Sequence, residues 1–575
     1  MKNFFRFLRA WSFPSRKRLV QAFTATHGAT RVFFSALLVC TVIIGAALIL
    51  RINEYISIRV PVAGGSFTEG VVGAPRFINP ILAVSDTDRD LTTLVYSGLM
   101  KRLPSGEIVP DSAEGYTVSS DGLTYTFTLK QNLTFHDKTP LTADDVVYTI
   151  AQVQNPAVGS PRRTSWAGIT IQKIDDRTVA FTLPKPFGPF LEATTIGILP
   201  AYLWKETTPE TFSFLALNTE PIGSGPYKFS SFEKKRNGIP TSYTFTRFNR
   251  YALGAPYIKK IFIQMYGNQD ELVRAINNGD VVSAAALSPE AVAHITNKHI
   301  HIHTAVLPRV FGVFLNPNQK SLFKDTALVA LIDEALDKEA LVTGVFGTYA
   351  RRIDGPVPFQ PVIDRAVPPK RSHEEIQAAF EAKGWIKNSS GILEQKGSRT
   401  PLYFSLVTAD TPELVKVAAA IRDTLSTYGI AVELKVYDLG ALSQNAIQSR
   451  NFDALLFGHV IENEADLYSF WHSSQRSYPG LNITQYANSR VDDLLEALLK
   501  TTDQETVDKN LALLDATIRT DHPALFIYLP HFLYATTDAI GGISLDRISQ
   551  PSDRFLGVQS WYRETEPVWK LFNKQ

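Results

Sequence analysis

The sequence predicts an α/β protein with more than one globular unit and an N-terminal helix that spans a membrane. The chain has 575 residues, which is too many for one hydrophobic core, so two or three units are expected. Residues 412–438, PELVKVAAAIRDTLSTYGIAVELKVYD, show the apolar spacing of a helix, a glycine that ends it and then a strand. This is the repeating unit of α/β folds. Residues 32–50 contain no charged side chain, which indicates the membrane-spanning helix.

The uncharged run at residues 32–50, VFFSALLVCTVIIGAALIL, is the first element of the chain. As a helix it spans about 28 Å, close to the roughly 30 Å hydrocarbon core of a bilayer. Residues 1–59 hold nine Lys or Arg and one acid, so the positive-inside rule places the basic segment 1–31 in the cytoplasm. A cleaved signal peptide is the alternative, but the run is longer than a usual h-region and no A-x-A site follows. We expect a single-pass protein of the cell membrane, with a tether at 51–64 and an extracellular or periplasmic ectodomain at 65–575.

The composition of the ectodomain argues against several functional classes. Beyond residue 59 the chain holds 49 basic and 55 acidic residues, a net charge of −6, and we find no basic stripe of the kind that binds nucleic acid. The only cysteine, Cys40, lies in the apolar run, so the ectodomain has neither a disulfide nor a thiol nucleophile. Nucleophile-elbow, Walker and metalloprotease motifs do not occur. We therefore do not expect an enzyme, and nothing in the sequence calls for a cofactor.

Residues 119–148, SSDGLTYTFTLKQNLTFHDKTPLTADDVVY, predict a turn, a strand and a capped helix. The Ser-Asp-Gly turn precedes an alternation of apolar and polar residues over 123–130, which is typical of a strand with one buried face. Thr142 and an acid three residues later predict a capping box, so Asp144 and Asp145 stabilise the start of a helix and are not catalysts. Further along, residues 324–347 predict one amphipathic helix that ends at Gly347.

These motifs, in this order, resemble the family 5 extracellular solute-binding proteins, the peptide, dipeptide and nickel binding components of ABC importers. Residues 119–148 match that family's run S-x-D-G-x-T-Y-T-F-x-L … F-H-D-G-x-P-L-T-A-x-D-V, with Lys138 where the family has Gly. GSGPYKF, which begins at Gly223, is similar to the family's Gly-Thr-Gly-Pro-Tyr bend. Residues 456–495 resemble its late ligand-side segment, and ALFIYLP near the C-terminus resembles its closing strand.

The resemblance covers residues 65 to 575 and implies a periplasmic-binding-protein-like fold of type II, in its three-domain peptide-binding variant. Two α/β lobes enclose the ligand, and an extra domain packs on the first lobe. We assign lobe I to residues 65–102, 205–305 and 535–575, the extra domain to 103–204 and lobe II to 306–534. The implied activity is the capture of short peptides for the transmembrane subunits of an ABC permease. A surface sensor or interaction protein on the same fold, or a binder of a metal or metal chelate, are the alternatives.

The resemblance also implies that an acid after the apolar strand at 452–458 binds the α-ammonium group of the ligand, because an unpaired buried charge is costly. Three acids follow that strand: Glu462, Glu464 and Asp466. A solvated loop is the alternative. Trp471 and His472, just downstream, either wall the pocket or pack in the core. Three further cleft candidates are Asn79, Asn316 and Trp166, although Asn before Pro is also favourable turn chemistry.

Two other groups of residues have a structural and a functional interpretation. Four residues suit a bend or hinge where the chain passes between lobes: Gly223, Ser224, Gly225 and Tyr227. The stretch HIHIH would place three imidazoles on one face of a strand, where they could capture a transition metal: His299, His301 and His303. Neighbouring strand residues splay apart and no acid or cysteine accompanies them in the sequence, so we favour an edge strand without metal.

Overall fold

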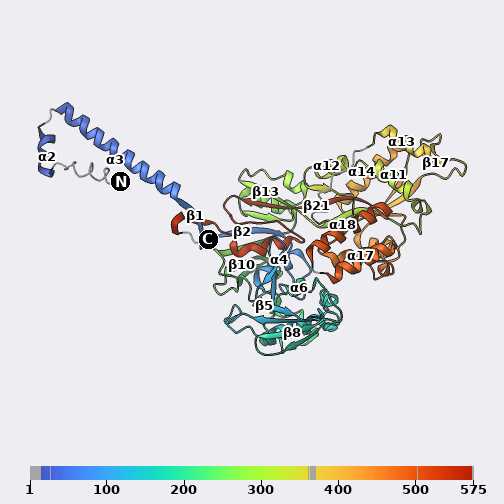
Figure 1. Ribbon diagram of the computed structural model, residues 1–575, viewed down its shortest axis with the longest axis horizontal. Coiled ribbons are helices and arrows are strands. Elements are labelled where there is room, and N and C mark those ends of the chain that lie inside the picture. The colour runs from blue at the N-terminus through green and yellow to red at the C-terminus, as the bar shows by residue number, and fades with distance from the viewer. Residues whose placement is uncertain (1–14, 26–27, 360–361, 363–370, 502, 573–575) are drawn as a thin grey trace. The chain divides into compact units, whose positions relative to one another are not determined.

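The computed structural model describes residues 15–25, 28–359, 362, 371–501 and 503–572 (Figure 1). The chain divides into a small unit, Met1–Val62 with Glu564–Gln575, and a large unit, Ala63–Arg563. The small unit contains the helices α2 (Arg16–Thr24) and α3 (Gly28–Ile56) and a pair of strands, β1 (Ser57–Val62) and β22 (Glu564–Trp569). The helix α3 includes the apolar run, and it is long and apolar enough to cross a membrane, with a mean hydropathy of 2.7.

The large unit is built on a 12-stranded mixed sheet. Its strands follow the order β19 (Ala431–Tyr437), β18 (Tyr403–Ala409), β20 (Ala454–Val460), β14 (Arg309–Leu315), β21 (Ala524–Thr537), β12 (Ser283–Ala285), β2 (Gly64–Val72), β11 (Ile258–Tyr266), β10 (Pro240–Arg247) and β9 (Tyr227–Lys234). Two more strands, β13 (Ile300–Val306) and β15 (Ala350–Arg352), also pair with β21. Parallel pairs occur in both halves of the sheet, between β2 and β11 and between β18 and β19, as expected for an α/β protein.

The long strand β21 joins the two halves of this sheet. Its first part, up to Tyr528, pairs with β14, and its second part, from His531, pairs with β13. The hydrophobic core changes at the same place, because Leu529 belongs to one buried cluster and Phe532 to another. The chain also crosses between the halves at residues 307–308, between β13 and β14. We call residues 310–529 the second lobe and the rest of the large unit the first lobe.

Helices pack on both halves of the sheet (Figure 1). The first lobe contains α4 (Asp86–Val95), α9 (Gln269–Asn278), α10 (Pro289–Ala293) and, near the C-terminus, the 3-10 helix η8 (Pro551–Ser560). The second lobe contains α11 (Thr326–Ala335), α12 (Lys338–Phe346), α13 (His373–Ala382), α14 (Pro412–Tyr428), α15 (Leu439–Leu442), α16 (Glu464–Trp471), α17 (Ser489–Lys500), α18 (Gln504–Asp521) and the strand pair β16 (Trp385–Lys387) and β17 (Leu393–Gln395). The predicted unit at 412–438 is confirmed: α14 ends at Gly429, whose φ of 91° suits glycine, and β19 follows.

A separate four-stranded antiparallel sheet lies within the first lobe, with α5 (Ala143–Gln154) beside it. Its strands are β5 (Ala113–Val118), β6 (Thr124–Leu129), β8 (Thr178–Thr182) and β7 (Thr170–Lys173). The predicted alternation is confirmed, because every second side chain of β6 is buried. The capping box is confirmed too: the Asp145 carboxylate accepts the Thr142 N–H at 2.8 Å and the Ala201 N–H at 2.8 Å. Shorter elements nearby are β3 (Met100–Arg102), β4 (Ile108–Pro110), α6 (Phe190–Ala193), α7 (Ala201–Trp204) and α8 (Pro209–Phe212).

The prediction of one helix over residues 324–347 is wrong, because the structure has two helices there, α11 and α12. The break lies at Leu336 and Asp337. The Asp337 side chain accepts the N–H of Ala340 at 3.1 Å, which makes it the N-cap of a new helix. The next residue, Lys338, is buried with its ammonium group 2.8 Å from Asp333 and 3.2 Å from Asp354. Helical periodicity continues through the break, so the apolar pattern alone does not reveal it.

Candidate ligand-binding cleft

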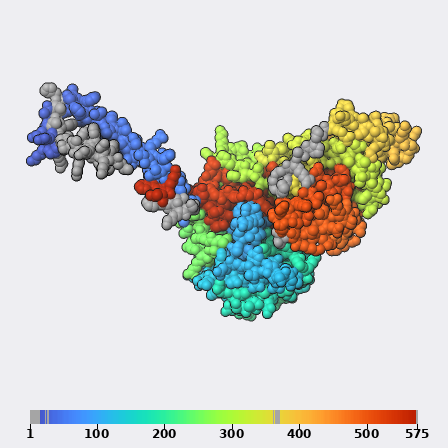
Figure 2. Space-filling view, viewed as in Figure 1, coloured from blue at the N-terminus to red at the C-terminus, as the bar shows by residue number. Residues whose placement is uncertain are grey.

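A cavity of about 870 Å³ lies between the two lobes. This volume falls in the range of about 300–1,000 Å³ that is usual for ligand pockets. The first lobe contributes α4 and the segment 162–197 to its walls, and the second lobe contributes the turn between β20 and α16. The lobes also touch beside it, where the Gly188 N–H donates to the Leu499 carbonyl at 3.1 Å. Figure 2 shows residues near position 500, in orange, against the blue and teal residues of the first lobe.

The walls of the cavity carry as many acids as cations. The cations are Arg89, Lys101, Arg102, Arg162 and Lys185, and the acids are Asp111, Glu192, Glu462, Asp466 and Asp553. Several of these charges are already neutralised within the protein: the Arg102 guanidinium lies 3.0 Å from Asp553 and 3.5 Å from Glu192. The Arg162 side chain is exposed in the cavity and forms no hydrogen bond or ion pair with any residue that the structure describes. A balanced wall with free charges of both signs suits a zwitterionic ligand.

The three acids that follow β20 have different surroundings. Asp466 accepts the backbone N–H groups of Glu462 and Asn463 at 2.8 and 3.1 Å, so its carboxylate caps α16. Glu464 begins that helix and does not line the cavity. Glu462 is half-buried in the wall, and among the described residues its carboxylate has no hydrogen-bond or ion-pair partner. Burial raises the pKa of Glu462; Asp553 adds to this effect and Arg102 opposes it. Glu462 is therefore the acid of the three that is available to a ligand.

Trp166 is the other sequence candidate that lines the cavity. Its ring is buried against Phe181 and Phe190, with ring centroids 5.8 and 6.0 Å away. The Trp166 carbonyl also accepts a hydrogen bond from Gln154 at 2.9 Å. The side chain therefore packs in the first lobe while one part of the residue borders the cavity. Sequence reasoning correctly predicts that Trp166 lies near the cleft, but it does not reveal that most of the side chain is buried in the core.

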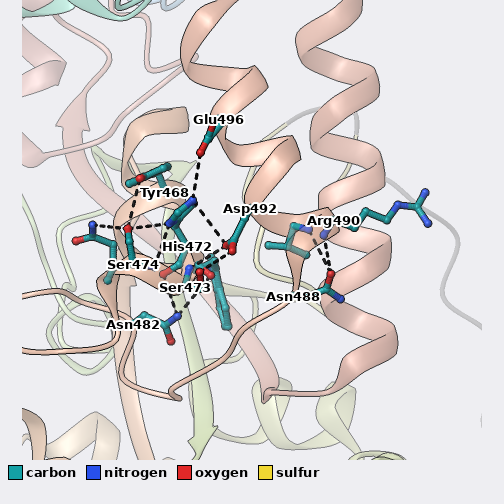
Figure 3. A network of polar contacts seen from close by, with 12 residues as sticks. Tyr468, His472, Ser473, Ser474, Asn482, Asn488, Arg490, Asp492 and Glu496 are labelled. Atoms are coloured by element: carbon teal, nitrogen blue, oxygen red, sulfur yellow. Dashed lines mark hydrogen bonds and ion pairs between the residues drawn. The ribbon is translucent and has the colours of Figure 1, made fainter. Parts of the chain in front are cut away.

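Trp471 and His472 lie in the interior of the second lobe and do not line the cavity. Figure 3 shows His472 beside Tyr468 and Ser474. Trp471 is 1% exposed and packs against Phe526 at a centroid distance of 5.7 Å. The His472 ring stacks on Tyr468 at 4.1 Å, and its Nδ1 lies 2.8 Å from the Ser474 hydroxyl. The structure therefore favours the core interpretation of both residues.

Asn79 and Asn316 are buried turn residues, and neither lines the cavity. The Asn79 side chain donates to the side-chain oxygen of Asn218 at 3.0 Å, and its own oxygen accepts the Ile81 N–H at 3.0 Å. The Asn316 side chain donates to the Arg450 carbonyl at 2.8 Å and accepts the N–H two residues later. Both side chains thus close an Asx-type turn before a proline, as the structural interpretation of Asn-Pro predicts.

The expected bend at residues 223–227 lies inside the first lobe and away from both crossings between the lobes. A Cβ atom at Gly223 would meet the Val95 carbonyl oxygen at 2.2 Å, so this position requires close packing and not mobility. Ser224 is buried beside it, Gly225 contacts the same backbone, and the Tyr227 hydroxyl donates to the Ile258 carbonyl at 3.1 Å. The segments that connect the lobes are β21 and residues 307–308 instead.

The three histidines of HIHIH do not come together as a metal site. His299 precedes β13, the His301 Nε2 lies 3.0 Å from a carboxylate oxygen of Asp538, and the His303 Nε2 lies 2.9 Å from the Thr536 hydroxyl. Within the described ranges there is no group of three or more His, Cys, Asp or Glu side chains that could hold a metal ion. Sequence reasoning did not identify Asp538, because it follows the distant strand β21.

Sequence reasoning missed a polar cluster on the cavity wall around Lys101. Its ammonium group donates to the Tyr251 hydroxyl at 2.9 Å and to the Gln559 side chain at 3.1 Å. Burial lowers the pKa of Lys101 to about 8, and burial raises the pKa of Asp111 to about 6. These residues are separated by up to several hundred positions in the chain, and no local motif links them.

His459, in the strand that leads to Glu462, should make the second lobe sensitive to acid. The buried ring lies between Phe314 and Phe470, and burial lowers its pKa to about 3. Between this value and the unfolded pKa near 6.5 the unfolded chain binds the extra proton, so stability falls as the pH falls. From pH 7 to 4.5 we expect a loss of about 2–3 kcal/mol from this residue. Urea unfolding of wild type and His459→Phe at both pH values measures it.

The exposed His299 provides the control for that experiment. His299→Phe should leave the acid-induced loss of stability as in wild type, whereas His459→Phe should reduce it. An equal pH dependence for His459→Phe and wild type would contradict the expectation that His459 is held neutral by its burial.

Comparison with known proteins agrees with this architecture. Residues 107–478 match the model of the bacterial extracellular solute-binding proteins, family 5 Middle. The oligopeptide-binding protein AppA of Bacillus subtilis is 26% identical over 519 residues, which cover 87% of this chain and 92% of AppA. The probable D,D-dipeptide-binding periplasmic protein DdpA of Escherichia coli is 26% identical over 495 residues, which cover 82% of this chain and 90% of DdpA.

The fold is similar to that of solved structures. The substrate-binding protein CtaP of an ABC transporter from Listeria monocytogenes aligns with a TM-score of 0.73 and 25% identity, covering 87% of this chain and 99% of CtaP. The matched model spans well over half of the chain, and these relatives are aligned over most of their length. The chain therefore belongs to the bacterial extracellular solute-binding proteins of family 5, a family of solute-binding proteins of transporters and not of enzymes.

Proposed function

We propose that this protein is a membrane-anchored receptor that captures short peptides in the cleft between its lobes and delivers them to an ABC permease. The observation that carries the proposal is the Glu462 carboxylate, which no described residue pairs with, in a charge-balanced cavity of about 870 Å³. Relatives named as oligopeptide-binding and dipeptide-binding proteins support the choice of peptides as ligands.

Two charges of the cleft that have no hydrogen-bond or ion-pair partner among the described residues, Glu462 and Arg162, suit the two ends of a peptide. The Glu462 carboxylate is available to an α-ammonium group, which would lose its hydration in the cleft and needs an acid in return. Arg162, on the wall from the first lobe, is available to a carboxylate. Pairing of Glu462 with an ammonium group would lower the raised pKa of the acid and favour its charged form. Ligands with both charges would therefore bind better than ligands with one.

The two crossings at β21 and residues 307–308 provide the places where the lobes can move relative to each other. In a two-lobe binding protein the open form admits the ligand and the closed form buries it. The permease would then distinguish loaded from empty receptors by the closed arrangement. The apolar helix α3 would hold the receptor in the membrane, with the basic residues before it on the cytoplasmic side.

A binding experiment with matched variants tests this proposal. The full-length protein in detergent is first examined by native mass spectrometry with a synthetic library of tripeptides to nonapeptides. The tightest peptide is then titrated by calorimetry into wild type, Glu462→Gln and Glu464→Gln. Loss of a charged hydrogen bond should weaken binding to Glu462→Gln by about tenfold to a hundredfold. Glu464→Gln should bind as wild type does, because Glu464 does not line the cavity.

N-terminal acetylation of the peptide provides the chemical control. The acetylated peptide should bind wild type and Glu462→Gln with similar affinity, because it has no ammonium group to lose. Absence of any bound peptide in the library experiment would contradict peptide capture. Binding that is equally tight to Glu462→Gln and wild type would remove Glu462 from the site while leaving peptide capture in place.

A further inference from the structure

The C-terminal strand β22 returns to the end of the apolar helix α3. It runs antiparallel to β1, with Ser57 opposite Trp569 and Val62 opposite Glu564. Because β1 begins directly after α3, the Trp569 end of β22 is the end next to the helix. A side-chain hydrogen bond fixes this position: the Trp569 indole N–H donates to the side-chain oxygen of Asn53 at 2.8 Å.

This hydrogen bond sets the depth of Trp569 relative to the apolar run. The run ends at Leu50, and Asn53 lies three residues further along the same helix, which is about 4.5 Å at the rise of an α-helix. The interfacial layer on each side of the hydrocarbon core is about 5–7 Å thick. If α3 spans a bilayer with its apolar run in the core, Asn53 and the indole of Trp569 lie within that layer.

The residues around this contact have the composition of a membrane interface. Trp569 is 49% exposed, Tyr55 is 80% exposed and Leu571 is 85% exposed. The Lys570 ammonium group lies 5.1 Å from the centre of the Tyr55 ring. Tryptophan and tyrosine are enriched at the level of the lipid head groups, where the ring is buried and the polar atom stays hydrated. Lysine beside them can meet lipid phosphates while its stem packs on apolar groups.

We propose that residues 569–571 form a second membrane contact, seated in the interfacial layer of the bilayer that α3 crosses. The inference rests on the membrane anchor of the proposed function. The lipid bilayer is the occupant that fits, because the patch continues the apolar helix and combines two aromatic rings, an exposed leucine and a lysine. The pairing of β22 with β1 also means that two strands, and not one flexible tether, leave the membrane surface.

Depth measurement by spin labelling tests the proposal on the full-length protein in liposomes. Cys40 is the only cysteine, so a nitroxide on the wild-type chain reports on the middle of α3. A nitroxide on Leu571→Cys in a Cys40→Ser background reports on the tail. The control is Glu564→Cys in the same background, at the far end of β22 and about 17 Å from Trp569. For each label, the accessibility to oxygen and to a water-soluble nickel complex gives the depth.

We expect the ratio of oxygen accessibility to nickel accessibility to be highest at residue 40, intermediate at residue 571 and lowest at residue 564. A ratio at 571 equal to that at 564, with a high ratio at 40, would overturn the membrane contact while the anchor remains. A label at 571 that neither reagent reaches would mean that protein covers the tail, which also overturns the lipid contact. A low ratio at 40 would show that α3 does not span the bilayer, and both the membrane anchor and the second membrane contact would then fail.

Discussion

Replacement of Arg554 by methionine should lower the free energy of unfolding by about 3–5 kcal/mol. Arg554 lies in η8, and its side chain is fully buried. Its guanidinium donates to Glu69 of β2 at 2.6 Å and to both carboxylate oxygens of Asp90 of α4 at 2.7 Å. Loss of the cation would leave two carboxylates without a counter-charge in the core. The effect is large because the cost is that of buried, unpaired charge and not of one lost contact.

The surrounding network does not replace the missing cation. Glu69 also accepts hydrogen bonds from Ser283 and Tyr534, at 2.7 and 2.8 Å. Burial raises the pKa of Asp90, and Arg554 opposes that rise in the wild-type protein. Without the cation, the folded variant should hold a proton that the unfolded chain releases near pH 4. Its stability therefore falls as the pH rises, and the deficit relative to wild type should be smaller at pH 5 than at pH 7.

Chemical unfolding of wild type and Arg554→Met at pH 7 and pH 5 measures both effects. Arg422→Met is the matched control, because Arg422 forms an exposed pair with Asp423 at 2.7 Å. Such surface pairs contribute little, so this variant should remain within about 0.5 kcal/mol of wild type. A loss for Arg554→Met as small as that of the control would contradict the view that the buried triad joins the C-terminal segment to β2 and α4.

Replacement of Trp471 by alanine should also cost about 3–5 kcal/mol, but it should leave the peptide affinity of the folded protein unchanged. The ring is enclosed by aromatic side chains of the second lobe, including Phe526 and Tyr486 with centroids 5.7 and 6.1 Å away. Removal of so large a side chain leaves a cavity that the core can only partly close. The cavity between the lobes is lined by other residues, so the binding site keeps its walls.

Trp166→Ala is the informative comparison for that experiment. Trp166 is equally buried but borders the cavity, so its loss should lower both stability and affinity. Thermal unfolding gives the first quantity, and calorimetric titration well below the melting temperature gives the second. A Trp471→Ala protein that keeps its stability and loses its affinity would return Trp471 to the pocket wall, which is the alternative that the sequence left open.

The sequence determined those features of this protein that depend on neighbouring residues. The alternation over 123–130 produced the strand β6, the Thr142 capping box produced the start of α5, and the unit at 412–438 produced α14 and β19. Together with the motifs shared with the family, these local patterns were enough to predict the fold class. Local patterns suffice here because a cap, a turn or an alternating strand is stabilised by contacts within a few residues.

Only the tertiary structure decided which side chains face the cavity. Glu462, Glu464 and Asp466 are three acids in one short segment, and the sequence alone does not distinguish them. In the structure Asp466 accepts two backbone N–H groups, whereas Glu462 stays open to the cleft. Trp471 is core because the distant strand β21 packs against it. Three other features join residues hundreds of positions apart: the hydrogen bonds of Lys101, the buried ion pairs of Arg554 and the pairing of β22 with β1. Such contacts leave no periodicity in the chain, because they depend on how the elements are brought together in space.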